Sequence, residues 1–338
     1  REPIAQFLFR HFRETGFPYP RYPEAELRSD WQALRDTDAA RLWDSTGTLL
    51  STGVTSGGKL FKHFFPHFFE CMEPKHPSML QQFEDDAVLL DVIRNRLGIT
   101  FTYRGVSFPF NISGDMLRQG MRSMHLAPMT TNFRASVAKA LYEKYLPEGG
   151  IAYDYSVGFG QRLLGFLADG RGALYLGCDP WEKQVEASRN VHAFVGRDDT
   201  QLVDLHVSGS ETFCPKTWQG TVDVAFSSPP YFEAEIYDSG KTDQAYSGRS
   251  YEAFLQDYWT PTVRNTRDLL RPGGNLILNI SKRYKKHPLK ADMLRIAQRE
   301  GFSLKQELGM SLSKSHLSGK VGTGTLTKTE PILVLKKI

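Results

Sequence analysis

The sequence has few cysteines and no long apolar run. Only three of its 338 residues are cysteines, Cys71, Cys178 and Cys214, which give no disulfide framework and suit a reducing cytoplasm. No stretch of about 18 apolar residues and no signal-peptide pattern occurs, so we expect neither a membrane span nor a membrane partner. The net charge is only +4, which permits nucleic-acid binding without predicting it. We therefore expect a cytoplasmic protein whose partners must be inferred from local motifs.

The composition is that of an ordinary globular protein. Hydrophobic residues make up 40% and charged residues 24% of the chain, and 338 residues suffice for two domains. From residue 151 onward, apolar runs alternate with helical segments, which predicts an α/β fold with a parallel, doubly wound sheet. The expected strands are 151–154, 173–178, 201–206, 222–227, 274–280, 302–309 and 331–336.

One of these strands ends in two prolines. The apolar run 222–227 is followed by Ser228-Pro229-Pro230-Tyr231. Proline has a fixed φ and no backbone N–H, so the strand cannot continue to pair through these residues. Their carbonyl oxygens then become rigid hydrogen-bond acceptors beside an aromatic ring. This arrangement suits an amino group on a flat ring, although proline pairs also occur in ordinary turns.

A glycine-rich turn precedes this motif in the chain. Asp154 ends the expected strand 151–154, and Ser156, Gly158 and Gly160 lie between it and a helical run. A strand, a tight glycine turn and a helix N-terminus form the usual binding site for nucleotide-like ligands in α/β proteins. The Gly-x-Gly pair alone is unspecific.

A second carboxylate follows the next apolar run. Asp179 ends the run 173–178, about 20 residues beyond the glycine turn, where it can accept hydrogen bonds from ribose hydroxyls. It can also cap the helix that follows, and the two roles are compatible. Ligands of open α/β sheets bind at the carboxyl ends of strands, and Asp154, Asp179, Ser210 and Ser228 fall at such ends. We therefore expect these four residues on one edge of the sheet.

In this order and spacing the motifs resemble those of class I S-adenosylmethionine-dependent methyltransferases. The Ser-Pro-Pro-Tyr tetrad narrows the resemblance to DNA amino-methyltransferases, which modify N4 of cytosine or N6 of adenine. The resemblance covers residues 128–338 and includes the Pro-Gly-Gly of 270–277. It implies a Rossmann-like seven-stranded methyltransferase sheet in residues 126–338. Residues 1–125 are then expected to form a mainly helical accessory domain for target recognition.

The resemblance also implies the cofactor and its contacts. In related enzymes the segment before the first strand closes over the methionine end of the cofactor, although here it can equally be a plain packing helix. Ser210 stands where the family commonly has an acidic residue that contacts the adenine amino group, and Glu211 could take this role instead. The expected contacts of S-adenosylmethionine are Asp154, Ser156, Gly158, Gly160, Asp179, Ser210, Asn132 and Phe133.

The implied reaction is direct methyl transfer to an exocyclic amino group of a flipped-out base. Ser228 and the carbonyl of Pro229 are expected to accept the amino hydrogens, and Tyr231 to stack on the base. A leading serine favours N4 of cytosine over N6 of adenine. The resemblance places the protein in a bacterium, an archaeon or a phage. Open alternatives are methylation of RNA or of a protein amide, and a catalytically silent module that binds nucleic acid.

Two basic segments are candidates for contact with double-stranded DNA. The segment 282–287 leaves the sheet at the expected active edge, and 311–328 is a loop rich in glycine, serine and threonine. Cations in such positions suit phosphate binding, although solvated charges and flexible loops have the same composition. The expected contacts are Lys282, Arg283, Lys285, Lys286, Lys314 and Lys320.

The first 125 residues contain two patterns that partly match known binding sites, one for phosphate and one for zinc. Residues 53–59 resemble a phosphate-binding loop, but Leu60 stands where a Mg²⁺-binding serine or threonine is required, so we do not expect nucleotide hydrolysis. Three histidines and a cysteine between residues 63 and 76 have zinc-like spacing, but prolines interrupt the helix that would align them. We expect no metal site, and by elimination this region is the candidate for target recognition.

Overall fold

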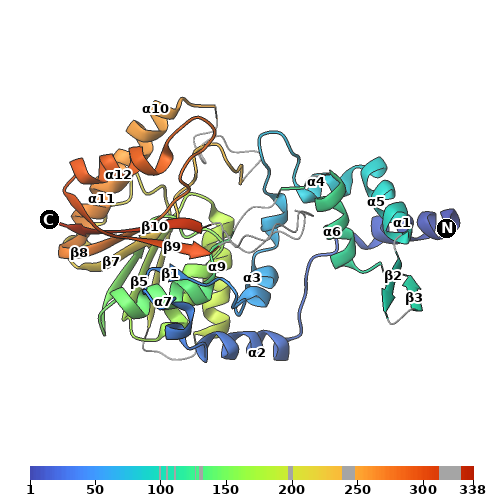
Figure 1. Ribbon diagram of the computed structural model, residues 1–338, viewed down its shortest axis with the longest axis horizontal. Coiled ribbons are helices and arrows are strands. Elements are labelled where there is room, and N and C mark those ends of the chain that lie inside the picture. The colour runs from blue at the N-terminus through green and yellow to red at the C-terminus, as the bar shows by residue number, and fades with distance from the viewer. Residues whose placement is uncertain are drawn as a thin grey trace. The chain divides into compact units, whose positions relative to one another are not determined.

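The structure is a computed structural model of the chain, and it divides into two compact units (Figure 1). The sheet unit comprises Pro23–Phe64, Asn132–Phe232 and Gly248–Ile338. The helical unit comprises Arg1–Tyr22, Phe65–Thr131 and Glu233–Ser247. The residues that the structure describes are 1–98, 100–103, 106–109, 112–125, 127–128, 132–196, 201–237, 248–311 and 329–338.

Within the described residues, the sheet unit is built around one mixed sheet of eight strands. The strands are β1 (Leu49–Leu50), β4 (Ile151–Asp154), β5 (Leu174–Asp179), β6 (Leu202–Val207), β7 (Val222–Ser227), β8 (Leu270–Asn279), β9 (Phe302–Ser311) and β10 (Thr329–Lys337). They lie in the order β1-β9-β10-β8-β7-β4-β5-β6, and β10 is antiparallel to both of its neighbours. The strands from β4 onward confirm the predicted Rossmann-like sheet of seven strands, and β1 is an additional edge strand.

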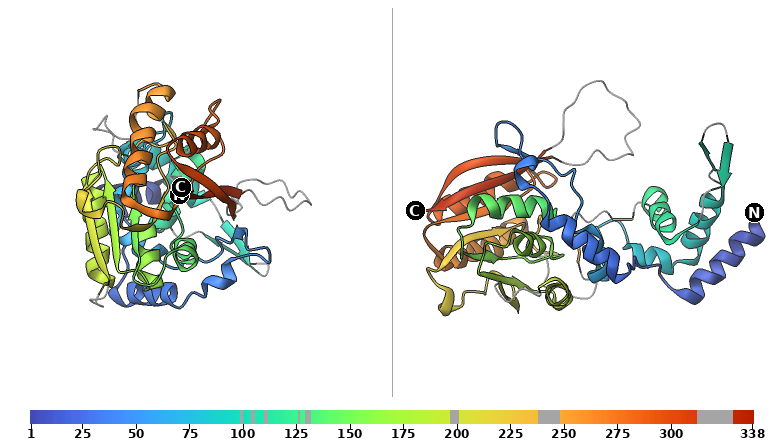
Figure 2. Two further views of the ribbon diagram at one scale, coloured as in Figure 1. Left: turned by 90° about the vertical axis from the view of Figure 1, so that its left-hand side faces the viewer. Right: turned by 90° about the horizontal axis from the view of Figure 1, so that it is seen from below.

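Continuous burial explains why the apolar runs form central strands. Every residue of β5 is buried, as expected for a parallel strand that is covered by helices on both faces. The helices α7 (Ala135–Tyr145) and α9 (Glu182–Val195) cover one face of the sheet (Figures 1 and 2). The helices α11 (Thr260–Leu269) and α12 (Leu289–Arg299) cover the other face. Right-handed crossovers on both sides of β4 produce this distribution and bring the carboxyl ends of β4, β5 and β7 to one edge.

Residues 23–64 belong to the sheet unit, which differs from the single boundary expected at residue 125. The helix α2 (Glu24–Arg35) packs against α8 (Gln161–Asp169), and β1 pairs with β9 in parallel. The ammonium group of Lys139 donates a hydrogen bond to the carbonyl oxygen of Arg35, 104 residues away, at 2.5 Å. These contacts join an early segment to the sheet across a long stretch of sequence, which no local pattern could indicate.

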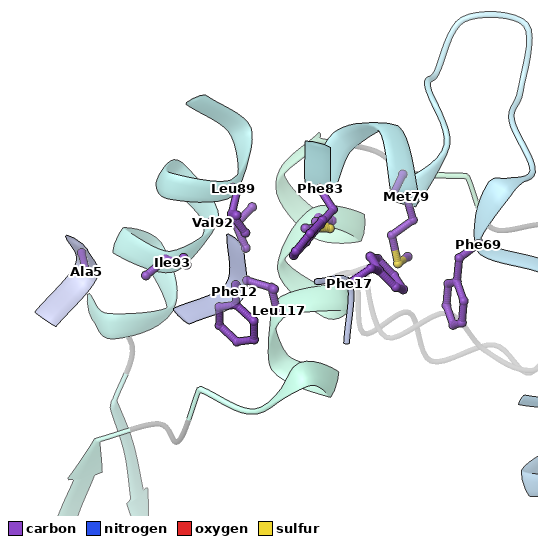
Figure 3. Close-up of a cluster of buried hydrophobic side chains, with 12 residues drawn as sticks. Ala5, Phe12, Phe17, Phe69, Met79, Phe83, Leu89, Val92, Ile93 and Leu117 are labelled. Carbon is purple, nitrogen blue, oxygen red and sulfur yellow. The ribbon is translucent and has the colours of Figure 1, made fainter. Parts of the chain in front are cut away.

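The helical unit has its own apolar core, drawn in Figure 3. Its helices are α1 (Glu2–Thr15), η2 (Pro66–Glu70), α4 (Met79–Glu84), α5 (Asp86–Gly98) and α6 (Gly114–His125), joined by the hairpin of β2 (Thr100–Tyr103) and β3 (Val106–Pro109). Phe12 and Phe17 from the start of the chain pack with Leu89 and Val92 of α5 and with Leu117 of α6. The accessory part is therefore mainly helical, as the sequence predicts.

None of the helices in the described parts of the chain combines the length and apolar character needed to cross a membrane. The same residues contain no group of three or more histidine, cysteine, aspartate or glutamate side chains placed to hold a metal ion. His67 and Cys71, which belong to the segment with zinc-like spacing, are buried in the helical unit.

Candidate functional site

Three motifs from the sequence meet at the carboxyl edge of the sheet. Asp154, Asp179 and Ser228 lie at the ends of the adjacent strands β4, β5 and β7. The hydroxyl of Ser227 donates to the carbonyl oxygen of Ser156 at 3.3 Å, which joins the proline-rich tetrad to the glycine turn. The shared edge that the sequence predicts is therefore present.

The glycine turn needs backbone angles that favour glycine. Gly158 has φ +55° and Gly160 has φ +66°, both in the left-handed region, and Gly160 is the N-cap of α8. The backbone N–H of Gly158 donates to Asp179 at 2.9 Å, and that of Trp181 donates to the other oxygen of the same carboxylate at 3.0 Å. Asp179 thus begins the segment that leads into α9 and also holds the turn. Burial raises the pKa of Asp179 to about 6.

Asp154 is fully buried and supports the glycine turn through hydrogen bonds. Its carboxylate accepts hydrogen bonds from Arg162 at 2.8 and 3.2 Å, from the hydroxyl of Tyr175 at 2.6 Å and from the backbone N–H of Ser156 at 3.2 Å. Arg162 also donates to the carbonyl oxygen of Ser156. With these partners Asp154 shapes the turn, and a direct contact between Asp154 and a cofactor stays a prediction. Arg162 was missed because an arginine inside a helix carries no motif signal.

The segment before β4 lies within the core of the sheet unit. The ring of Phe133 is buried and lies 5.3 Å from that of Phe226 in β7, while Asn132 is half-buried. The side chain of Gln161 accepts from the backbone N–H of Ala135 at 3.0 Å, which fixes the start of α7 beside that of α8. Phe133 is thus a packing residue in this structure, and Asn132 is the more accessible of the pair.

Ser210 has a partner other than a cofactor. Its buried hydroxyl lies 2.9 Å from that of Thr262 in α11, and its carbonyl oxygen accepts from Asn265 at 3.0 Å. These contacts attach the loop after β6 to α11. Glu211, the alternative residue for this position, is half-buried.

The loop that imitates a phosphate site already binds a carboxylate. Asp30 accepts hydrogen bonds from the backbone N–H groups of Gly57, Lys59 and Leu60 at 3.1, 2.8 and 3.1 Å. These groups open α3 (Gly58–Phe64), where a phosphate would bind in a nucleotide-binding loop. An internal anion takes that place, which agrees with the expectation that this loop does not hydrolyse nucleotides.

The tetrad is linked to two distant strands. The hydroxyls of Ser228 and Tyr231 lie 3.3 Å apart. The Tyr231 hydroxyl donates to Glu330 of β10 at 2.9 Å and to Asn279 of β8 at 3.3 Å. Pro229 is buried, and the other three residues of the tetrad are half-buried. No local pattern indicates Glu330 as a partner of the tetrad, since it lies 99 residues after Tyr231.

A strained phenylalanine follows the tetrad. Phe232 is buried with φ +59°, a region that bulky side chains rarely adopt. Its ring packs against those of Tyr251, Phe254, Tyr284 and His287 at centroid distances of 5.4 to 5.9 Å. This aromatic cluster fixes the chain direction at the point where it leaves the tetrad.

The aromatic cluster also anchors the basic segment that follows β8. Tyr284 and His287 exchange two backbone hydrogen bonds at 3.0 and 2.9 Å, and the His287 ring stacks on Tyr251 at 4.0 Å. Four exposed cations belong to this segment. Lys282 and Arg283 precede Tyr284, and Lys285 and Lys286 lie between Tyr284 and His287. We call residues 281–288 the basic loop. Lys314 and Lys320, the remaining expected contacts, lie outside the described residues.

A π-helical segment, η4 (Phe254–Trp259), also reaches the turn. The hydroxyl of Tyr258 lies 3.5 Å from that of Ser156, and Trp259 packs beside Tyr155 at 6.2 Å. Such segments are rare and often occur at functional sites. No motif in the sequence indicates this segment.

No family model and no curated protein matches this chain. Among solved structures, the [4+2]-cyclase SpnF is 13% identical with a TM-score of 0.42, over 62% of this chain and 84% of its own. A putative RNA methyltransferase from Pyrococcus horikoshii is 11% identical with a TM-score of 0.39, over 60% and 83%. A SAM-dependent methyltransferase from Methanosarcina mazei is 11% identical with a TM-score of 0.40, over 59% and 97%. Likenesses at this level leave the activity to be argued from the site itself.

Proposed function

We propose that this protein is an S-adenosylmethionine-dependent DNA methyltransferase that modifies an exocyclic amino group, N4 of cytosine in preference to N6 of adenine. The observation that carries the proposal is the Ser-Pro-Pro-Tyr tetrad at the end of β7, joined to the glycine turn by the Ser227–Ser156 hydrogen bond. A rigid acceptor for an amino group thus lies directly beside a nucleotide-type turn.

The residues of the turn fit the cofactor. A Cβ at Gly177 would lie 2.6 Å from the side chain of Val157, so this glycine lets the turn lie close over β5. The buried Asp179 carboxylate can accept hydrogen bonds from ribose hydroxyls. Gly158 and Gly160 let the backbone approach a bound ligand closely. When bound, S-adenosylmethionine supplies an electrophilic methyl group.

The protein's own part in the reaction is to hold and aim the amino group. Ser228 and the Pro229 carbonyl accept its two hydrogens, which directs the nitrogen lone pair toward the methyl donor. Tyr231 stacks on the base, which must leave the duplex to reach this position. The exposed cations of the basic loop contact the phosphate backbone. The helical unit, which carries no catalytic motif, selects the target sequence.

A direct assay tests this proposal. We would incubate the protein with labelled S-adenosylmethionine and either duplex DNA or RNA, digest the product to nucleosides and identify the methylated species by mass spectrometry. Labelled N4-methylcytosine in DNA is the expected result. Ser228→Ala should abolish turnover and leave cofactor binding intact, whereas Ser303→Ala, an equal change on β9, should leave both unchanged.

The other outcomes each remove part of the proposal. N6-methyladenine would keep the amino chemistry and overturn the preference for cytosine. Methyl transfer to RNA alone would overturn the DNA substrate. Cofactor binding without transfer to any nucleic acid would overturn the enzyme assignment in favour of a silent methyltransferase-like module.

A further inference from the structure

A carboxylate that the reaction described above does not use lies behind the tetrad. Glu330 is near the start of β10, and its two oxygens accept hydrogen bonds from different side chains. Tyr231 donates to Oε1 at 2.9 Å, and the amide of Asn279 donates to Oε2 at 3.3 Å. Asn279 is itself buried and also donates to the carbonyl oxygen of Pro331. When Glu330 is ionised, the network ends on its carboxylate, which accepts and cannot donate.

Because the ionised Glu330 can only accept, it determines the direction of each hydrogen bond that leads to it from Ser228 and Tyr231. The hydroxyl of Tyr231 has one proton and directs it toward Glu330 and Asn279, so toward Ser228 its oxygen acts as the acceptor. Ser228 then directs its own proton toward Tyr231, 3.3 Å away. The lone pairs of the Ser228 oxygen are left for a donor on the substrate.

We infer that Glu330 is a positioning residue which, through Tyr231, makes Ser228 a hydrogen-bond acceptor and so selects a base edge with an amino group over one with a carbonyl group. This inference rests on the proposed function. A serine hydroxyl can donate or accept, whereas a carboxylate oxygen only accepts. Glu330 removes the ambiguity that serine introduces.

The surroundings of Glu330 favour a titration that the experiment can follow. Burial raises the pKa of the carboxyl group, and the hydrogen bonds from Tyr231 and Asn279 oppose this rise. The residue that faces Glu330 across the strand pair is the uncharged Met310 of β9. Lys282 and Glu307 line a cavity beside β10. A protonated Glu330 could donate to Tyr231 and reverse the chain, so turnover should rise with pH as Glu330 ionises.

The test uses the full chain and the base that the nucleoside assay identifies. Duplexes carry either that base or its deaminated counterpart, in which a carbonyl replaces the amino group. The wild-type protein should prefer the amino duplex by at least about tenfold in Kd. Glu330→Gln and Tyr231→Phe should narrow this preference and lower kcat at saturating cofactor by about tenfold or more, while Glu330→Asp should restore part of both. Cofactor Kd and the midpoint of thermal unfolding should stay unchanged.

The pH profile of kcat separates this role from a structural one. Its acid limb, measured at saturating cofactor, should disappear in Glu330→Gln. An unchanged limb, or an unchanged preference for the amino duplex in both Glu330→Gln and Tyr231→Phe, would overturn the role of Glu330 and leave the proposed function standing. If the wild-type protein methylates no amino group, the proposed function fails and the role of Glu330 fails with it.

Discussion

The carboxylate of Asp179 accepts one backbone N–H on each oxygen, from Gly158 in the glycine turn and from Trp181 just before α9. Only the ionised form has lone pairs to spare for ribose hydroxyls as well. Burial has already raised its pKa to about 6, so the free protein binds a proton here at and below about pH 6. A bound ribose would favour the ionised form, and ligand binding would therefore release that proton.

We predict that cofactor affinity rises with pH through about 6 and levels off above it. The sign follows from the proton count, because the free protein holds more protons at Asp179 than the complex does. Calorimetric titration with S-adenosylhomocysteine between about pH 5 and 8 measures this, and Asp179→Asn should weaken binding and flatten the profile.

Asp169 provides a matched control, since burial raises its pKa to about 6 as well, while it pairs with Arg171 at the far end of α8. Asp169→Asn should keep the pH dependence of cofactor binding. A profile that stays flat in the wild-type protein, or that falls with rising pH, would contradict the role given to Asp179.

At the scale of elements, the basic loop is anchored by aromatic contacts of Tyr284 and His287 and not by its charged side chains. Tyr284 and His287 fix it to the cluster around Phe232, so its exposed cations keep a defined position beside the tetrad. A loop anchored in this way pays less conformational entropy when it binds a phosphate backbone. The strain at Phe232 is consistent with such a requirement, because strained backbone persists where the surroundings determine it.

We predict that Lys285→Gln with Lys286→Gln weakens DNA binding and lowers the slope of log K against log salt concentration by about 2, because two phosphate contacts are lost. Lys216→Gln with Lys305→Gln removes the same charge from exposed positions elsewhere on the sheet unit and should change the slope little. Fluorescence anisotropy over a salt series measures both. Equal slopes for the two double variants would show that the loop contributes only net charge.

At the scale of the whole molecule, the sequence predicts those structural features that depend on residues close together in the chain. The strand runs are continuous, Asp179 ends β5, and two prolines follow closely after β7, so the sheet and its ligand edge can be located from them. Contacts between distant segments could not be predicted. The two-residue β1, the capping of α3 by Asp30 and the approach of Glu330 to Tyr231 depend on chain segments that meet only in the folded protein.

The assignment of residues 23–64 to the sheet unit leads to a prediction about truncation. A fragment of residues 126–338 lacks β1, α2 and α3, and it exposes the surfaces on β9 and α8 that they cover. We expect this fragment to be unfolded or insoluble and unable to bind S-adenosylhomocysteine, because several hundred Å² of apolar surface would face water.

Removal of residues 1–22 is the matched control. It takes α1, Phe12 and Phe17 from the core of the helical unit and leaves the sheet unit complete. This variant should still bind the cofactor, but it should lose sequence-selective DNA binding, because the helical unit can no longer pack. Calorimetry, limited proteolysis and anisotropy distinguish the two truncations. Normal cofactor binding by the fragment 126–338 would show that residues 23–64 are dispensable for the sheet unit and restore the boundary at residue 125.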